Sequence, residues 1–96
     1  MDTIASFPKI AIRIIKEQAL IIGPLAWDEA KKAGIQIIDI KKEEIIVGNG
    51  DPKGVIDRLV TQYERIFGKA SHEVCRDAVR DIIAELPPEE VPSSLK

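Results

Sequence analysis

The sequence predicts a small α+β domain in which one antiparallel hairpin packs with three to four helices. Two short segments rich in β-branched residues lie between segments with helical periodicity. Asp51 and Pro52 separate the second of these from an amphipathic helix, because aspartate favours the N-cap and proline the first helical turn. With 96 residues there is room for one hydrophobic core. We therefore expect the order α(α)ββαα in a single domain, residues 1–88, followed by a mobile polar tail, residues 89–96.

The first helix is predicted to begin near Ser6 and Pro8 and to run up to Gly23. Gly23 and Pro24 interrupt the pattern, which leaves two interpretations: a break with a new helix from Pro24, or one kinked helix. In both, the chain is helical again up to Gly34. The apolar residues of the first helix surround it, which indicates burial on more than one side; they are Phe7, Ile10, Ala11, Ile12, Ile14, Ile15, Ala19, Leu20, Ile21 and Ile22.

The hairpin is predicted from residues 35–40 and 44–47, which are β-branched runs of strand length. Lys41, Lys42 and Glu43 lie between them and close the turn. The isoleucines of the first strand fall on both faces, which predicts that both sides of the ribbon are covered: Ile35 and Ile37 share one face, and Ile38 and Ile40 share the other.

Two further helices complete the domain. One runs from Pro52 to Phe67 and stops at Gly68, and its apolar residues are Val55, Ile56, Leu59, Val60, Tyr63, Ile66 and Phe67. The other begins at Ala70 or Ser71 and ends before Pro87 and Pro88, with an apolar stripe of Val74, Ala78, Val79, Ile82, Ile83 and Leu86.

The composition excludes several classes of function. Fourteen basic and 16 acidic residues give a net charge of −2, with no basic half, so nucleic-acid binding is disfavoured. Cys75 is the single cysteine, so no intramolecular disulfide can form. The N-terminus lacks the order of a signal peptide, and the longest apolar run, Ala19 to Ile22, is too short for a membrane span. We expect a cytoplasmic protein without membrane contact.

The glycine-rich segment from Gly48 to Gly54 precedes a helix start and therefore suggests an anion site, formed by Gly50, Lys53 and Gly54. The Lys-Ser/Thr pair of a Walker loop is absent, and an Asp51 cap would occupy the same N–H groups. A capped turn is the preferred interpretation, and a small-ligand or anion site is the alternative.

His72 and Cys75 are three residues apart, so one helical face could offer both to a metal or form a nucleophile–base pair. Two ligands do not complete a metal site, and nothing in the sequence would orient the histidine or supply an oxyanion hole. The sequence therefore predicts no metal site, no cofactor and no enzymatic activity.

Two short segments resemble helix-turn-helix connections in terminal helical segments of prokaryotic signalling proteins. They are Leu59-x-x-x-Tyr63-Glu64-x-x-Phe67-Gly68-x-Ala70 and, more loosely, Ile21 to Ala26. The resemblance implies tight helix–helix turns. It carries over no functional residue, because neither a receiver phosphorylation site nor a kinase motif accompanies it.

The resulting hypothesis is a small interaction module, a homodimer or another homo-oligomer, in signalling or regulation, with another protein as a further partner. A two-stranded ribbon has open edges, and the first helix has more apolar surface than its neighbours could cover. The candidate interface residues are Ile15, Ile22 and Trp27. The alternative is a monomer whose helices cover the ribbon completely.

Overall fold

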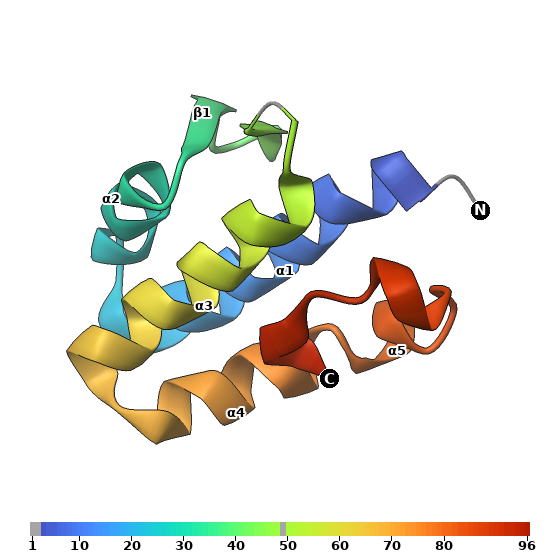
Figure 1. Cartoon of the computed structure of the whole chain (residues 1–96). Coiled ribbons are helices and arrows are strands. Elements are labelled where there is room, and N and C mark those ends of the chain that lie inside the picture. Colours follow the sequence, from blue (N-terminus) through green and yellow to red (C-terminus); the bar gives the residue numbers. More distant parts are fainter. Residues whose placement is uncertain (1–2, 49) are drawn as a thin grey trace.

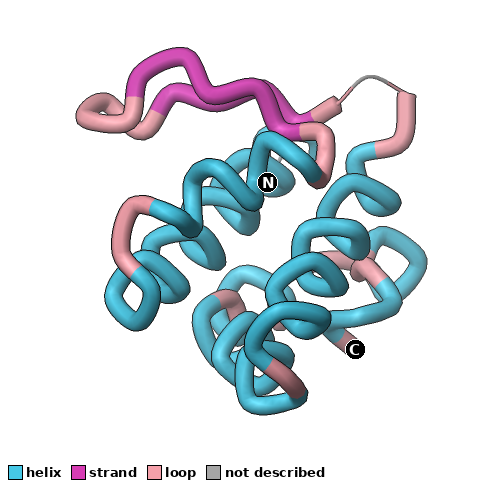
Figure 2. The backbone as a smooth tube through the Cα atoms, turned by 90° about the vertical axis from the view of Figure 1, so that its left-hand side faces the viewer, coloured by secondary structure: helices cyan, strands magenta, loops and turns pink. Residues whose placement is uncertain are grey.

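The computed structural model describes residues 3–48 and 50–96, and it confirms the α+β class (Figure 1). A two-stranded antiparallel sheet forms one layer above a group of helices, as Figure 2 shows. Ile35 pairs with Val47 and Ile37 with Ile45, and the register shifts before Asp39. The elements are α1 Thr3–Ile22, α2 Leu25–Lys32, β1 Ile35–Asp39, β2 Glu44–Val47, α3 Pro52–Phe67, α4 Lys69–Ala78, α5 Arg80–Ile83 and two 3-10 turns, Pro88–Glu90 and Ser93–Leu95.

Helix α1 is the central element, because it contacts α2, α3, α4 and β2. This position explains its apolar circumference: Phe7, Ile10, Ala11, Ile14 and Ile15 are all buried. The helix starts at Thr3, ahead of the predicted start near Ser6, so Pro8 lies inside it. Proline there removes one backbone donor, and burial of the neighbouring apolar residues offsets this cost. Among the described residues, no helix is both long and apolar enough to cross a membrane.

Of the two interpretations at Gly23 and Pro24, the break is correct. Gly23 adopts φ 72°, a left-handed conformation that glycine reaches without strain, and its N–H donates to the carbonyl of Ala19 at 2.9 Å. Helix α2 begins at Leu25, directly after Pro24. The chain therefore turns here, and α2 packs against α1 and α3.

The start of α3 is as predicted. A carboxylate oxygen of Asp51 accepts a hydrogen bond from the N–H of Gly54 at 3.0 Å, and Pro52 occupies the first turn. The predicted apolar stripe is buried from Val55 to Tyr63, but Ile66 and Phe67 at the end of the helix are exposed. The periodic pattern therefore identifies the buried side of the helix everywhere except in its last turn.

Two polar side chains tie α2 to α3. The hydroxyl of Tyr63, fully buried, donates to the carbonyl of Ala26 at 2.6 Å. Glu29, also buried, accepts hydrogen bonds from Gln62 at 2.7 Å and from Lys32 at 3.1 Å. These hydrogen bonds lower the pKa of the Glu29 carboxyl below its ordinary value, and the bond from Gln62 has the largest effect.

The last helix is divided where one continuous helix was predicted. Val79, with φ −119°, leaves helical geometry between α4 and α5, and this turn brings both Val79 and Ile82 into the core. Val79 and Ile82 are thus buried as predicted, but within α4 the buried residue is Cys75, while its neighbour Val74, which the predicted stripe contained, is only half-buried.

The predicted mobile tail packs against the domain instead. Val91 and Leu95 are buried, and the backbone N–H and hydroxyl of Ser94 donate to the carboxylate of Asp57 at 3.0 and 2.6 Å. Lys53 donates to the carbonyl of Glu89 at 2.5 Å. The apolar residues of this segment pack against α3 and α4 and cover the core there.

Candidate interaction surface

The tip of the hairpin is a tight turn formed by residues 40–43. The N–H of Glu43 donates to the carbonyl of Ile40 at 3.2 Å, and the N–H of Lys42 donates to the Asp39 carboxylate at 3.1 Å. Glu43 takes a left-handed conformation, φ 56°, and its carboxylate lies 2.6 Å from the ammonium of Lys16 in α1. The tip is thus held in one place above the central helix.

One face of the ribbon is open, which corrects the prediction that both faces are covered. Ile35 and Ile37 point toward the helices and join the core. Ile38 and Ile46 in the strands are 54 and 43% exposed, and Ile40 in the turn is 49% exposed. We call these three residues the hairpin patch. A ribbon of only two strands and one helical layer leaves the opposite face to the solvent (Figure 2).

An apolar groove runs beside the hairpin patch. It has a volume of about 450 Å³ and lies between β2 and the starts of α1 and α3. Its lining includes Phe7, Pro8, Val47 and Pro52, together with Ile46 of the patch. Apolar surface therefore continues from the open face of the ribbon around the edge of β2.

A second exposed apolar group lies where α1 meets α2. Leu20, Ile21 and Leu25, which we call the corner patch, are 81, 63 and 46% exposed. Leu20 and Ile21 belong to the last turn of α1, and Leu25 is the first residue of α2. Figure 1 shows this corner at the opposite end of α1 from the start of the helix.

The three predicted interface residues lie elsewhere. Ile15 is fully buried and Trp27 is 9% exposed, so the chain's own helices enclose both. Ile22 packs partly against the same core. They were expected at an interface because the first helix has more apolar surface than a peripheral helix can bury. Its central position uses most of that surface inside the protomer.

The candidate anion site is occupied by the protein's own groups. The Asp51 carboxylate accepts a hydrogen bond from the N–H of Gly54, and a Cβ built on Gly54 would lie 2.1 Å from that carboxylate. Lys53 binds the carbonyl of Glu89, and Gly50, φ 82°, serves the turn into the helix. The residue between Gly48 and Gly50 lies outside the described part of the chain. The geometry here is that of a capped turn.

His72 and Cys75 do not converge on a common point. The ring of His72 contacts the carbonyl of Ser94 at 2.5 Å and the carboxylate of Glu64 at 3.1 Å. Cys75 faces the core, where Gln18 donates to its sulfur at 3.4 Å and burial raises the pKa of the thiol to about 11. No group of three or more metal-ligating side chains occurs in the described ranges.

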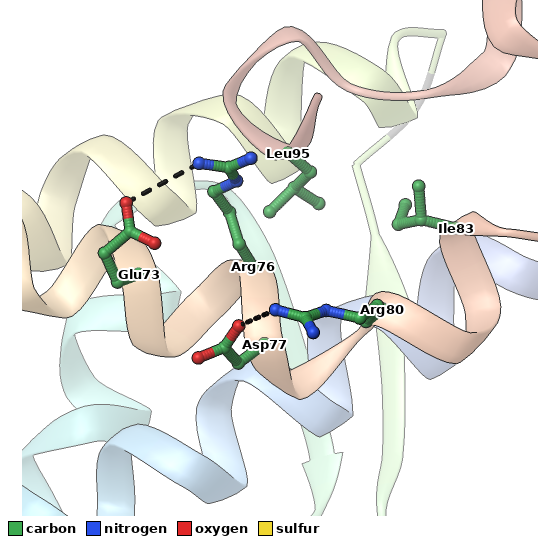
Figure 3. A pocket seen from close by; sticks show the side chains of 6 residues that line it. All are labelled: Glu73, Arg76, Asp77, Arg80, Ile83 and Leu95. Atoms are coloured by element: carbon green, nitrogen blue, oxygen red, sulfur yellow. Dashed lines mark hydrogen bonds and ion pairs between the residues drawn. The ribbon is translucent and has the colours of Figure 1, made fainter.

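A small polar pocket of about 160 Å³ lies between α4, α5 and the C-terminal segment (Figure 3). Its two arginines are each paired with an acidic residue of the same helical region: Arg76 with Glu73 at 3.5 Å, and Arg80 with Asp77 at 2.5 Å. The charges of these four side chains cancel, so the pocket offers no excess charge to a ligand.

Comparisons with known protein families, with characterised proteins and with solved structures find no significant match. The resemblance to helix-turn-helix connections of signalling proteins therefore stays a prediction, and the function is argued from the surface of this chain.

Proposed function

We propose that this chain is a non-enzymatic protein-interaction module that associates with a second copy of itself through the hairpin patch. The observation that carries the proposal is the exposed apolar surface of the hairpin, where Ile38 and Ile46 in the strands and Ile40 in the turn are about half exposed. Each strand has only one partner among the described residues, so each also has an open edge. Covering this face removes apolar surface from water and protects edges that could otherwise pair with unrelated chains.

A second copy supplies a partner with the same apolar face. Two-fold symmetry brings one patch against an identical one, and such homodimers are the commonest closed assemblies. The groove beside Ile46 extends the apolar area beyond the ribbon itself. A cytoplasmic location and a signalling or regulatory context remain predictions from the sequence.

Methyl NMR on a dilution series tests which surface associates. We expect the signals of Ile38, Ile40 and Ile46 to shift with protein concentration, while those of Leu20 and Leu25 stay constant. Shifts confined to the corner patch would place the interface there and contradict the proposal. Signals that are constant over the whole series would contradict self-association itself.

A further inference from the structure

The C-terminal segment, residues 89–96, packs on α3 and α4, and both helices hold it at one residue, Ser94 (Figure 1). Asp57 of α3 accepts hydrogen bonds from the N–H and the hydroxyl of Ser94. On the other side, the ring of His72 in α4 contacts the carbonyl oxygen of Ser94 at 2.5 Å. The position of the segment therefore depends on these two titratable side chains as well as on its apolar residues.

The two contacts of the His72 ring require two protons. Nδ1 lies 3.1 Å from a carboxylate oxygen of Glu64 in α3, and Nε2 faces the Ser94 carbonyl. An ionised carboxylate and a carbonyl only accept hydrogen bonds, so each ring nitrogen must donate one. Only the cationic imidazolium carries a proton on both nitrogens. The closed position of the C-terminal segment is therefore matched to the cationic form of His72.

Loss of one proton weakens the contact to the C-terminal segment rather than the contact to α3. A neutral imidazole keeps one N–H, and a hydrogen bond to a carboxylate is stronger than one to a neutral carbonyl. The remaining proton therefore stays on Nδ1, which faces Glu64. Nε2 then presents a lone pair to the Ser94 carbonyl oxygen, so the hydrogen bond to the segment is lost.

The other charged and titratable side chains around His72 come from three elements. They are Lys53, Asp57 and Glu64 of α3, Lys69, Cys75 and Arg76 at helical spacing from His72 on α4, and Glu89, Glu90 and Lys96 of the C-terminal segment. Carboxylates ordinarily lose their charge below about pH 5, and lysine and arginine above about pH 9. Burial raises the pKa of the Cys75 thiol to about 11. The chain has one histidine, so a change between about pH 5.5 and about pH 8 points to His72.

From this geometry we infer that His72 is a proton-dependent latch: its cationic form holds the C-terminal segment closed on α3 and α4, and its neutral form lets the segment open more often. Opening uncovers the surface on which Val91 and Leu95 pack, since both side chains are buried in the closed position. The bonds to Asp57 and the apolar contacts persist when His72 is neutral, so the segment opens transiently. The latch lies outside the hairpin patch and does not depend on the proposed self-association.

Amide hydrogen exchange of Leu95 measures the opening of the segment. The N–H of Leu95 donates to the carbonyl of Pro92 at 2.9 Å and exchanges when this turn opens. Dividing the rate by that of an unstructured peptide at the same pH removes the intrinsic effect of pH on exchange. We expect the protection of Leu95 to fall about tenfold between about pH 5.5 and about pH 8, because the closed form loses a hydrogen bond from a cation.

Two variants separate the parts of the latch. His72→Gln removes the titrating ring, so the protection of Leu95 should be the same at both pH values. Glu64→Gln replaces the carboxylate with an amide that can donate to Nδ1, so the single proton of the neutral ring can stay on Nε2 and hold Ser94. The fall in protection should then be smaller than in the parent.

The ¹⁵N signals of the one imidazole ring test the latch in the parent itself, without relying on a variant to fold. Both ring nitrogens should be protonated at about pH 5.5, and only Nδ1 at about pH 8. The latch is contradicted if Nε2 keeps the proton of the neutral ring, if Leu95 is equally protected at both pH values, or if His72→Gln retains the fall seen in the parent. None of these results affects the proposed self-association, which the dilution series tests separately.

Discussion

The ammonium of Lys16 and the carboxylate of Glu43 lie 2.6 Å apart and join the hairpin tip to the central helix. Both side chains are about half exposed, so this ion pair positions the tip more than it stabilises the fold. Burial of Ile35 and Ile37 supplies the stronger attachment of the ribbon.

Lys16→Gln should therefore lower the free energy of unfolding by only about 0.2–1 kcal/mol. Urea denaturation followed by circular dichroism measures this change. A larger loss would mean that the ion pair, and not the apolar inner face of the ribbon, holds the hairpin in place.

Removal of the cap of α3 should have a larger effect. Asp51→Ala leaves the N–H of Gly54 without its partner and is expected to cost about 0.5–2 kcal/mol of stability. Asp51→Asn keeps a capping oxygen and serves as the control. If the two variants have the same denaturation midpoint, the hydrogen bond from Gly54 to the Asp51 side chain does not stabilise the fold.

The C-terminal segment should behave as part of the core. Leu95 is 5% exposed, and Leu95→Ala is expected to cost about 2–5 kcal/mol, whereas the exposed Lys96→Ala should change little. Thermal unfolding of both variants checks this. A Leu95→Ala protein as stable as the parent would support the mobile tail that the sequence predicted.

The helices, the hairpin and the Asp51 cap could be predicted, because each depends on local chemistry such as proline, glycine and periodicity. At Gly23 and Pro24 the same chemistry left a break and a kink open, and only the structure decides for the break. The packed C-terminal segment could not, since only Val91 and Leu95 among eight mostly polar residues mark it as core. The open face of the ribbon was also missed. Isoleucines on both faces do not reveal whether the chain has a second layer to cover them.

The candidate surface was predicted only in part. The open edges of the ribbon were expected, but the interface residues were placed on the first helix and at Trp27. The apolar excess of α1 is visible in the sequence, but a central helix buries that excess within the protomer, and this topology follows from long-range packing. Ile15→Glu is therefore expected to unfold the protomer, because the side chain is fully buried. A folded, monomeric Ile15→Glu protein would contradict this placement.

Glu29 should make stability depend on pH. Its pKa is lowered in the folded state by the hydrogen bonds from Gln62 and Lys32, so its contribution is present above the ordinary value of 4.5 and is lost as pH falls through the folded pKa. Thermal melting points of the parent and of Glu29→Gln should therefore differ most at neutral pH and converge in acid. A constant difference across the acidic range would exclude this linkage.

Sedimentation equilibrium of the parent chain at micromolar concentrations tests self-association through the hairpin patch most directly. Ile46→Asp and Ile66→Asp form a matched pair, because the two isoleucines are 43 and 44% exposed and only the first belongs to the patch. We predict that the parent and Ile66→Asp approach twice the chain mass of 10.6 kDa, and that Ile46→Asp sediments at the chain mass. A parent that sediments at 10.6 kDa throughout, or an Ile46→Asp variant that dimerises like the parent, would contradict the account.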